Sequence, residues 1–185
     1  MRSLAELPIT ALAWKKGTAI PLSFKLHGND GIYATLTFQN EERTLARVET
    51  DEGAWTLKHL GVMVPAVTLR AEGGTTNLAI FHPHALRHGK LQFADGVAYD
   101  WAWLHGDVPG GAFLDSEGLP LVRLHGFAGR GLRSTSDLQT CDVELGLLPT
   151  GRSRQALLAA IGWYLILFDH IKERDAVAAV TSLRL

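Results

Sequence analysis

The stretch that decides the fold is Ala156-Leu-Leu-Ala-Ala-Ile-Gly-Trp-Tyr-Leu-Ile-Leu-Phe168, a run of thirteen residues without a charge. Helix formers fill its first half, and apolar side chains would occupy every side of a helical wheel. Such a helix must be surrounded by apolar partners. Thirteen residues rise about 20 Å, whereas a bilayer core needs roughly 20 residues. We therefore expect a helix over about residues 153–170 that is enclosed in protein, and no transmembrane span.

The chain before this run, from about residue 9 to 148, predicts a series of short strands. Its segments are rich in β-branched and aromatic residues and are separated by turn formers such as Asp95-Gly96. We expect ten to twelve strands, among them residues 32–39, 44–49, 66–70, 78–81, 97–104, 119–124 and 142–147. A strand of about six residues spans about 20 Å and so matches the helix in length. The predicted fold is mainly β: a closed antiparallel β-barrel of about twelve strands that encloses a hydrophobic C-terminal α-helix.

Individual residues indicate where the helix begins and how closely it packs against the barrel. Thr150 and Ser153 are candidate N-caps where the strands give way to the helix. Gly162 is unfavourable inside a helix by about 1 kcal/mol relative to Ala, which makes sense where the barrel wall approaches the helix backbone. The tail, residues 171–185, gives no clear prediction, and residues 176–180 fit either more helix or an edge strand.

Composition limits the domain count and the partners. A chain of 185 residues that is 46% hydrophobic predicts a single domain over residues 1–185. With 18 basic and 19 acidic residues the net charge is near −1, which gives no long-range field for nucleic acid. The single cysteine, Cys141, predicts a small buried hydrophobe, and the N-terminus lacks the apolar core of a signal peptide. We expect a cytoplasmic protein that does not bind nucleic acid.

The order of these elements resembles a known superfamily. A β-rich chain of about 150 residues, followed by a very apolar helix that ends in Trp163-Tyr-Leu-Ile-Leu-Phe-Asp169, resembles the Tubby C-terminal-like superfamily, which includes phospholipid scramblases and LURP-one-related proteins. Hairpins such as Gly111-Ala-Phe-Leu-Asp-Ser-Glu-Gly118 are similar to those that build its barrel wall. The resemblance implies a twelve-stranded barrel around a central hydrophobic helix.

The same resemblance implies a binding role. Members are mostly lipid-surface or protein-interaction modules, and Tubby proteins bind phosphoinositide head groups through a Lys and Arg cluster. This chain lacks the proline-rich arm, the cysteine cluster and the complete calcium loop of scramblases, and no residue set here maps onto the Tubby cluster. The implied function is a non-enzymatic module, without a cofactor, that contacts a peripheral membrane lipid or a protein partner.

An enzymatic alternative rests on three histidines. His82 and His84 lie two residues apart, so in an extended segment they face the same side and could share a metal with His88. The spacing resembles the His-x-His element of cupins, which would make the protein a metal-dependent β-barrel enzyme. The other interpretation is that Pro83 marks the end of a strand and the histidines lie in a solvated loop with Lys90.

Two further segments carry candidate ligand contacts. Arg130 and Arg133 lie in a glycine- and hydroxyl-rich loop and could bind a lipid phosphate through their guanidinium forks. Tyr99, Trp101 and Trp103 would share one face of a strand, and we expect them to pack in the barrel core. No acid/base pair or nucleophile arrangement stands at a recognisable spacing, so the sequence favours binding over catalysis.

Overall fold

The computed structural model describes residues 1, 11–61, 65–84, 88–104, 110–126, 140–146 and 154–182, with side chains up to residue 170. In this part of the chain there are twelve strands and one helix. Their bounds are β1 Leu12–Ala19, β2 Leu22–Gly28, β3 Gly31–Phe38, β4 Leu45–Thr50, β5 Gly53–Leu60, β6 Ala66–Ala71, β7 Asn77–Pro83, β8 His88–Phe93, β9 Ala98–Leu104, β10 Gly110–Leu114, β11 Pro120–His125, β12 Thr140–Leu145 and α1 Gln155–Ser182.

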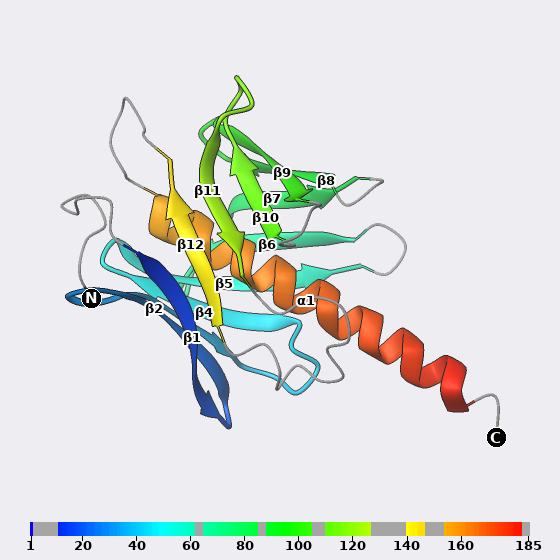
Figure 1. Cartoon of the computed structure of the whole chain (residues 1–185). Coiled ribbons are helices and arrows are strands. Elements are labelled where there is room, and N and C mark those ends of the chain that lie inside the picture. The colour runs from blue at the N-terminus through cyan, green and yellow to red at the C-terminus, as the bar shows by residue number, and fades with distance from the viewer. Residues whose placement is uncertain are drawn as a thin grey trace.

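The strands form a closed antiparallel barrel (Figure 1). Each strand pairs with the next one along the chain, and β12 returns to pair with β1. In that closing pair Leu12 lies opposite Val143, and Lys15 lies opposite Thr140. Closure leaves no unpaired sheet edge. The predicted barrel of about twelve antiparallel strands is confirmed.

Alternation along the strands separates the core from the outer surface. In β4 the side chains of Ala46 and Val48 are buried, whereas those of Arg47 and Glu49 lie on the outer face. Arg47 pairs there with Glu49 at 2.6 Å and with Glu72 at 2.5 Å. Successive side chains of a strand point to opposite faces, so this alternation is what directs the apolar set inward.

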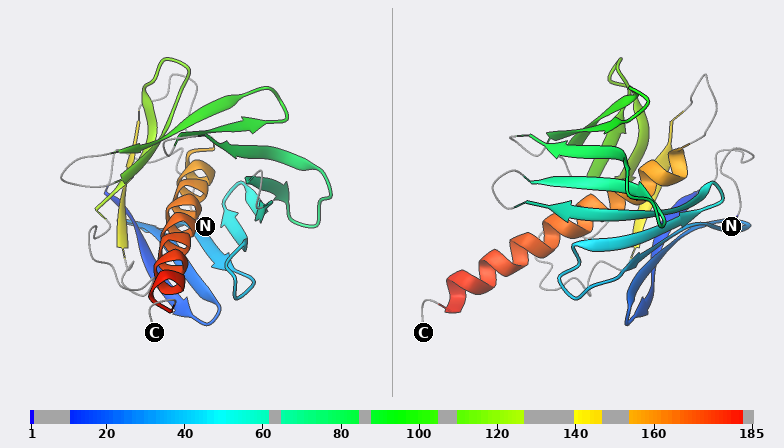
Figure 2. Two further views of the ribbon diagram at one scale, coloured as in Figure 1. Left: turned by 90° about the vertical axis from the view of Figure 1, so that its right-hand side faces the viewer. Right: turned by 180° about the vertical axis from the view of Figure 1, so that it is seen from behind.

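The first half of α1 fills the barrel. Figure 2 shows the helix running between the strands and emerging from the barrel towards its C-terminus. The helix residues from 155 to 167 are all buried. The Trp163 ring packs edge-on against Phe24 at 5.5 Å, and the Tyr164 ring stacks on Phe38 at 5.9 Å. The prediction that this run forms a helix inside the barrel is confirmed.

Gly162 lies where the helix and the wall meet. A Cβ at this position would lie 2.7 Å from Leu124 Cδ1 and 3.0 Å from Trp101 Cζ3. A side chain here would displace the Leu124 methyl group and press on the Trp101 ring, so the absence of one allows the close approach predicted from the sequence.

The helix bounds differ from those expected. α1 begins at Gln155 and continues to Ser182, so the segment left open as a tail is helical, including residues 176–180. Residues 171–182 contain no Gly or Pro that would stop a helix, and half of them are the good helix formers Ala, Lys, Glu and Arg. The candidate N-caps Thr150 and Ser153 lie outside the described residues. Among the helical residues that the structure describes, none form a stretch both long and apolar enough to span a bilayer.

The up-and-down topology creates two ends, which we name by the helix. At the helix-entry end, β2, β4, β6, β8 and β10 finish and α1 begins; at the helix-exit end, β1, β3, β5, β7, β9 and β11 finish and α1 leaves the barrel. The contacts of the helix agree with this assignment. Arg154, next to the first helical residue, contacts Asp95 between β8 and β9, whereas Tyr164 contacts Thr44 between β3 and β4.

Candidate functional site

The five turns that join strands at the helix-entry end are acidic. The five turns at this end, residues 29–30, 51–52, 72–76, 94–97 and 115–119, contain no Lys or Arg. They contain seven carboxylates: Asp30, Asp51, Glu52, Glu72, Asp95, Asp115 and Glu117. Several of these groups cap their own turns, as where Asp115 Oδ1 accepts backbone N–H bonds from Glu117 and Leu119 at 2.9 and 2.8 Å. The hairpin expected around residues 111–118 is confirmed, and these residues form its turn.

Arg154 fastens the helix to this acidic end. Its backbone N–H donates to Glu52 Oε1 at 3.0 Å, and its guanidinium Nη2 lies 2.5 Å from Asp95 Oδ2. The guanidinium also stacks over the Phe93 ring, 4.6 Å from its centroid. The hydrogen bond from Arg154 lowers the pKa of the Asp95 carboxyl below its ordinary value. Carboxylates beside a helix N-terminus also complement the helix dipole, so the charges here stabilise the fold.

Gln155 joins the start of the helix to the barrel wall at the helix-entry end. Its side chain is fully buried, and its Nε2 donates to the Leu121 carbonyl at 3.1 Å and to the Gly146 carbonyl at 3.0 Å. These bonds join the first helical residue to β11 and to the end of β12. The entry end is therefore a structural joint between helix and wall.

An aromatic stack closes the barrel at the helix-exit end. The Tyr164 and Phe168 rings stack at 6.0 Å, and His59 stacks on Phe168 at 4.3 Å. The buried Tyr164 hydroxyl donates to the Thr44 carbonyl at 2.9 Å, and burial raises the pKa of this phenol. The hydroxyl therefore stays protonated and serves as a structural donor.

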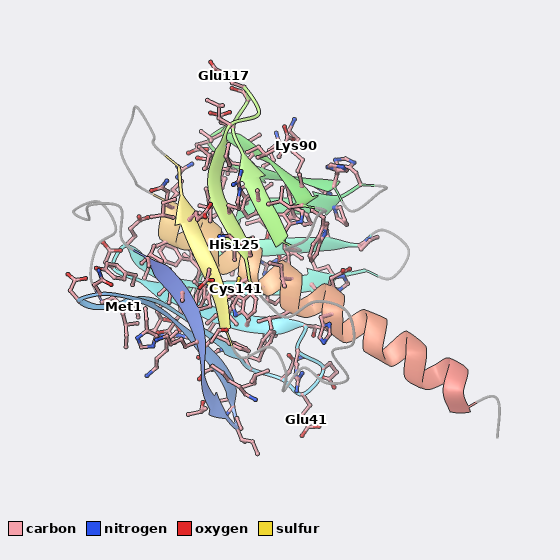
Figure 3. All side chains as sticks on the ribbon, in the orientation of Figure 1. Met1, Glu41, Lys90, Glu117, His125 and Cys141 are labelled. Atoms are coloured by element: carbon pink, nitrogen blue, oxygen red, sulfur yellow. The ribbon has the colours of Figure 1, made fainter. Side chains whose placement is uncertain are left out.

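The three predicted metal-ligand histidines lie at this same end: His82 in β7, His84 directly after it, and His88 at the start of β8. His82 is part of β7, opposite Lys90, and the His84 N–H donates to the His88 carbonyl at 2.7 Å. All three side chains are exposed, and Lys90 Nζ lies 3.9 Å from Asp100 Oδ1 on the outer surface (Figure 3). Within the described residues no three His, Cys, Asp or Glu side chains gather to hold a metal ion. The histidines thus lie beside a cation on the outside of a barrel whose interior is filled.

Arg130 and Arg133, the predicted ligand contacts, lie outside the described residues. The segment that contains them follows Gly126 and precedes Thr140. Thr140 opens β12 and is paired with Lys15 of β1.

The β1–β2 hairpin carries candidate binding side chains that the sequence reasoning missed. Lys15 and Lys25 are directly opposite one another on the outer face, because Trp14 and Leu26 beside them point into the core. At the tip, Ile20 is 93% exposed. An apolar tip flanked by lysines was visible in the sequence, but its meaning depended on a strand pairing that the sequence does not give.

Other predictions concern the core. Trp101 is 2% exposed, and Tyr99 and Trp103 are partly buried and pack against the core, which confirms that the three aromatic residues face inward. Cys141 is buried, as expected, and burial raises the pKa of its thiol. These side chains contribute to packing.

Comparisons with protein-family models, with curated proteins and with solved structures find no match to this chain.

Proposed function

We propose that the protein is a non-enzymatic binding module whose helix-exit end contacts the surface of an anionic membrane. The observation that carries this proposal is the distribution of charge between the two ends. The entry-end turns hold seven carboxylates and no Lys or Arg, whereas Lys15 of β1 and Lys25 of β2, on the outer face towards the exit end, have no carboxylate partner among the described residues. A net charge near −1 conceals this separation.

The separation of charge would orient the molecule. An anionic surface attracts the end with exposed cations and repels the end with carboxylates, and each cation near such a surface contributes about 1 kcal/mol. The cytoplasmic leaflet carries anionic lipids. This agrees with the expected cytoplasmic location.

The filled barrel supports a role for the outer surface. The lumen holds the side chains of α1, including the fully buried Trp163 and Tyr164, so a ligand meets the protein on its exterior. The same burial argues against α1 as an anchor, because withdrawal of the helix would expose the core. The resemblance to the Tubby C-terminal-like superfamily, whose members are mostly lipid-surface or protein-interaction modules, agrees with this role.

Vesicle flotation tests the proposal. We expect weak binding to phosphatidylcholine vesicles that contain phosphatidylserine, loss of that binding at physiological salt, and none to phosphatidylcholine alone. The Arg130→Ala/Arg133→Ala variant should bind the phosphatidylserine vesicles more weakly than the wild type does. The Asp115→Asn/Glu117→Gln variant, which is changed at the entry end, should not bind them more weakly.

Two results would contradict the membrane proposal. Absence of binding at both low and physiological salt would indicate a protein partner instead. Tight binding that does not depend on salt concentration would mean that the apolar helix is a membrane anchor.

The enzymatic alternative has its own test. Untagged protein should contain far less than one zinc, iron or manganese per chain, because His82 and His84 are exposed beside Lys90 and lack anionic ligands among the described residues. Metal near one per chain, lost in the His82→Ala/His84→Ala variant, would favour the enzyme.

A further inference from the structure

We propose that the β1–β2 hairpin is the element that enters the membrane, with Ile20 inserted at the level of the head groups and Lys15 and Lys25 bound to lipid phosphates. This inference rests on the proposed function, and it names the surface that performs it. The partner is an anionic bilayer. The hairpin projects away from the rest of the barrel in each view (Figures 1 and 2).

The tip of the hairpin is held in one shape by its own hydroxyl groups. The Thr18 N–H donates to Ser23 Oγ at 3.0 Å, and the Thr18 hydroxyl donates to the Pro21 carbonyl at 2.6 Å. The two hydroxyl oxygens lie 2.8 Å apart. These polar groups of Thr18, Pro21 and Ser23 are therefore satisfied within the hairpin, which reduces the cost of moving them out of water.

The apolar part of the tip is left outside this network. Ala19, Ile20 and Pro21 are all exposed, and Ile20 reaches 93%. A scattered apolar side chain is ordinary on a protein surface. Here three occur in succession at the end of a projecting hairpin, where a flat surface can reach all of them together.

The hairpin at the opposite end provides an internal comparison. Leu119, between β10 and β11, is 58% exposed, but Asp115 and Glu117 lie in the same turn. An anionic bilayer would repel that tip. The tip at Ile20 is followed along its strands by Lys16, Lys15 and Lys25. The two tips thus share an apolar residue and differ in the charge beside it.

The two lysines gain from an anionic ligand. Residues directly opposite in an antiparallel pair have Cα atoms about 4.5–5.5 Å apart, and like charges at such a position are destabilising. In the part of the chain that the structure describes, neither Lys15 nor Lys25 has a carboxylate partner. A phosphate between or above the two ammonium groups would neutralise both, which is the role assigned here to the lipid.

Acidic residues at the helix-exit end limit the affinity. Glu41 and Glu42 lie between β3 and β4, and β3 pairs with β2 (Figure 3). Asn40 Nδ2 donates to Glu42 Oε2 at 2.9 Å and so holds that carboxylate close to its own loop. The contact with the membrane is accordingly centred on the hairpin and does not extend over the turn that holds Glu41 and Glu42.

A fluorescent label at each tip tests the inference. Cys141 is buried, so Ile20→Cys provides a single accessible thiol for an environment-sensitive fluorophore such as NBD. Leu119→Cys, labelled in the same way, is the matched control at the opposite end, and wild-type protein treated with the reagent checks that Cys141 does not react. Vesicles of phosphatidylcholine with phosphatidylserine are the probe, and sedimentation measures binding of the same samples.

We expect a blue shift and an intensity gain for the label at position 20 and no change at position 119. Sedimentation without a shift at position 20 would overturn the hairpin inference and leave the proposed function standing. Absence of sedimentation would overturn the proposed function itself. A shift at both positions would contradict the proposed orientation.

Unlabelled variants separate the two parts of the hairpin. Ile20→Ser should weaken vesicle binding at every salt concentration, because it removes the apolar contact. Lys15→Gln with Lys25→Gln should weaken binding about 30-fold at low salt, or about 5-fold for each lysine, and the loss should shrink as salt increases. The control, Arg123→Gln, lies on the outer wall in an ion pair with Glu144 and should bind as the wild type does. Equal binding by the lysine variant and the wild type would contradict the inference.

Discussion

The two ends of the barrel use charge in opposite ways. At the helix-entry end the Arg154 guanidinium pairs with Asp95, and the Arg154 backbone N–H donates to Glu52, so both carboxylates help to hold the helix against the wall. At the helix-exit end Lys15 and Lys25 are opposed to each other and lack a carboxylate partner among the described residues. The comparison teaches that a net charge near −1 conceals a local difference, with carboxylates gathered in the turns of one end and two lysines opposed to each other towards the other end.

The largest effect should come from the core that both ends share. Ile161 is fully buried inside the barrel, so Ile161→Asp places an unpaired carboxylate among apolar side chains. The cost of several kcal/mol approaches the whole stability of a domain, about 5–15 kcal/mol. We expect loss of the cooperative thermal transition in circular dichroism, and the same outcome for a chain that ends before Arg152.

A matched truncation sharpens this result. A chain that ends after His170 keeps the buried part of α1, which reaches Leu167, and should melt close to the wild-type temperature. If instead the chain ending before Arg152 remains soluble, monomeric and cooperatively folded, the helix is not the core of the barrel.

The next largest effect should come from the entry-end joint. Gln155→Glu is nearly isosteric, but it replaces an amide that donates to two carbonyl groups with a buried carboxylate facing the same oxygens. We expect a loss of about 2–4 kcal/mol in the free energy of unfolding at neutral pH, measured by urea denaturation. A loss below 1 kcal/mol would show that Gln155 does not join the helix to β11 and β12.

The corresponding test at the helix-exit end should give a smaller loss. Tyr164→Phe removes the hydroxyl that donates to the Thr44 carbonyl, but that oxygen keeps its bond from the His59 N–H at 2.8 Å. We expect a loss of about 1 kcal/mol in the free energy of unfolding, with vesicle binding unchanged. Loss of binding at unchanged stability would mean that Tyr164 contacts the ligand.

The ion pair at the entry end should appear as a pH dependence. Arg154 lowers the pKa of Asp95 in the folded chain, so the unfolded state binds more protons in acid. This contribution to stability is complete above the unfolded carboxyl pKa of about 3.9 and is lost as pH falls through the lower folded pKa. The stability difference between wild type and Asp95→Asn should therefore shrink below about pH 4.

Arg154→Ala isolates the stacking contribution. At low pH this variant should still lose the contact with Phe93, worth about 0.5–1 kcal/mol at an exposed site. Urea titrations of both variants at pH 7 and pH 3 measure the two parts. A difference between wild type and Asp95→Asn that stays constant over this range would contradict the coupling.

The sequence predicted the fold because its signals are local. The uncharged run ending at Phe168 and the alternation in strands such as β4 each identify an element from its own residues, and Gly162 indicated the close approach to the wall. The helix was predicted to end near residue 170 because the apolar run ends there. The following charged residues are good helix formers, so the helix continues to Ser182.

The surface could not be predicted because it depends on pairing. Lys15 and Lys25 face each other only in the observed register, and that hairpin contains a register shift between Lys16 and Ala19. The gathering of carboxylates at one end follows from alternate turns, a property of the closed topology that no single segment reveals. The near-zero net charge predicted no long-range electrostatic field, whereas the fold gathers the turn carboxylates at one end.

The smallest effect should have the opposite sign. Lys15→Gln with Lys25→Gln removes a repulsion between directly opposed like charges, so it should stabilise the fold by a few tenths of a kcal/mol up to about 1 kcal/mol. Salt already screens this repulsion, and the gain in melting temperature should be larger at low ionic strength than at high. Arg123→Gln breaks an ion pair on the same barrel wall and should not stabilise the fold. If the lysine side chains stabilise the fold, their removal lowers the free energy of unfolding. If they serve to bind an anionic partner, their removal raises the free energy of unfolding and weakens binding. A variant that loses both stability and binding would show that the two lysines hold the hairpin in place, and the contrast between the two ends would then lose its functional meaning.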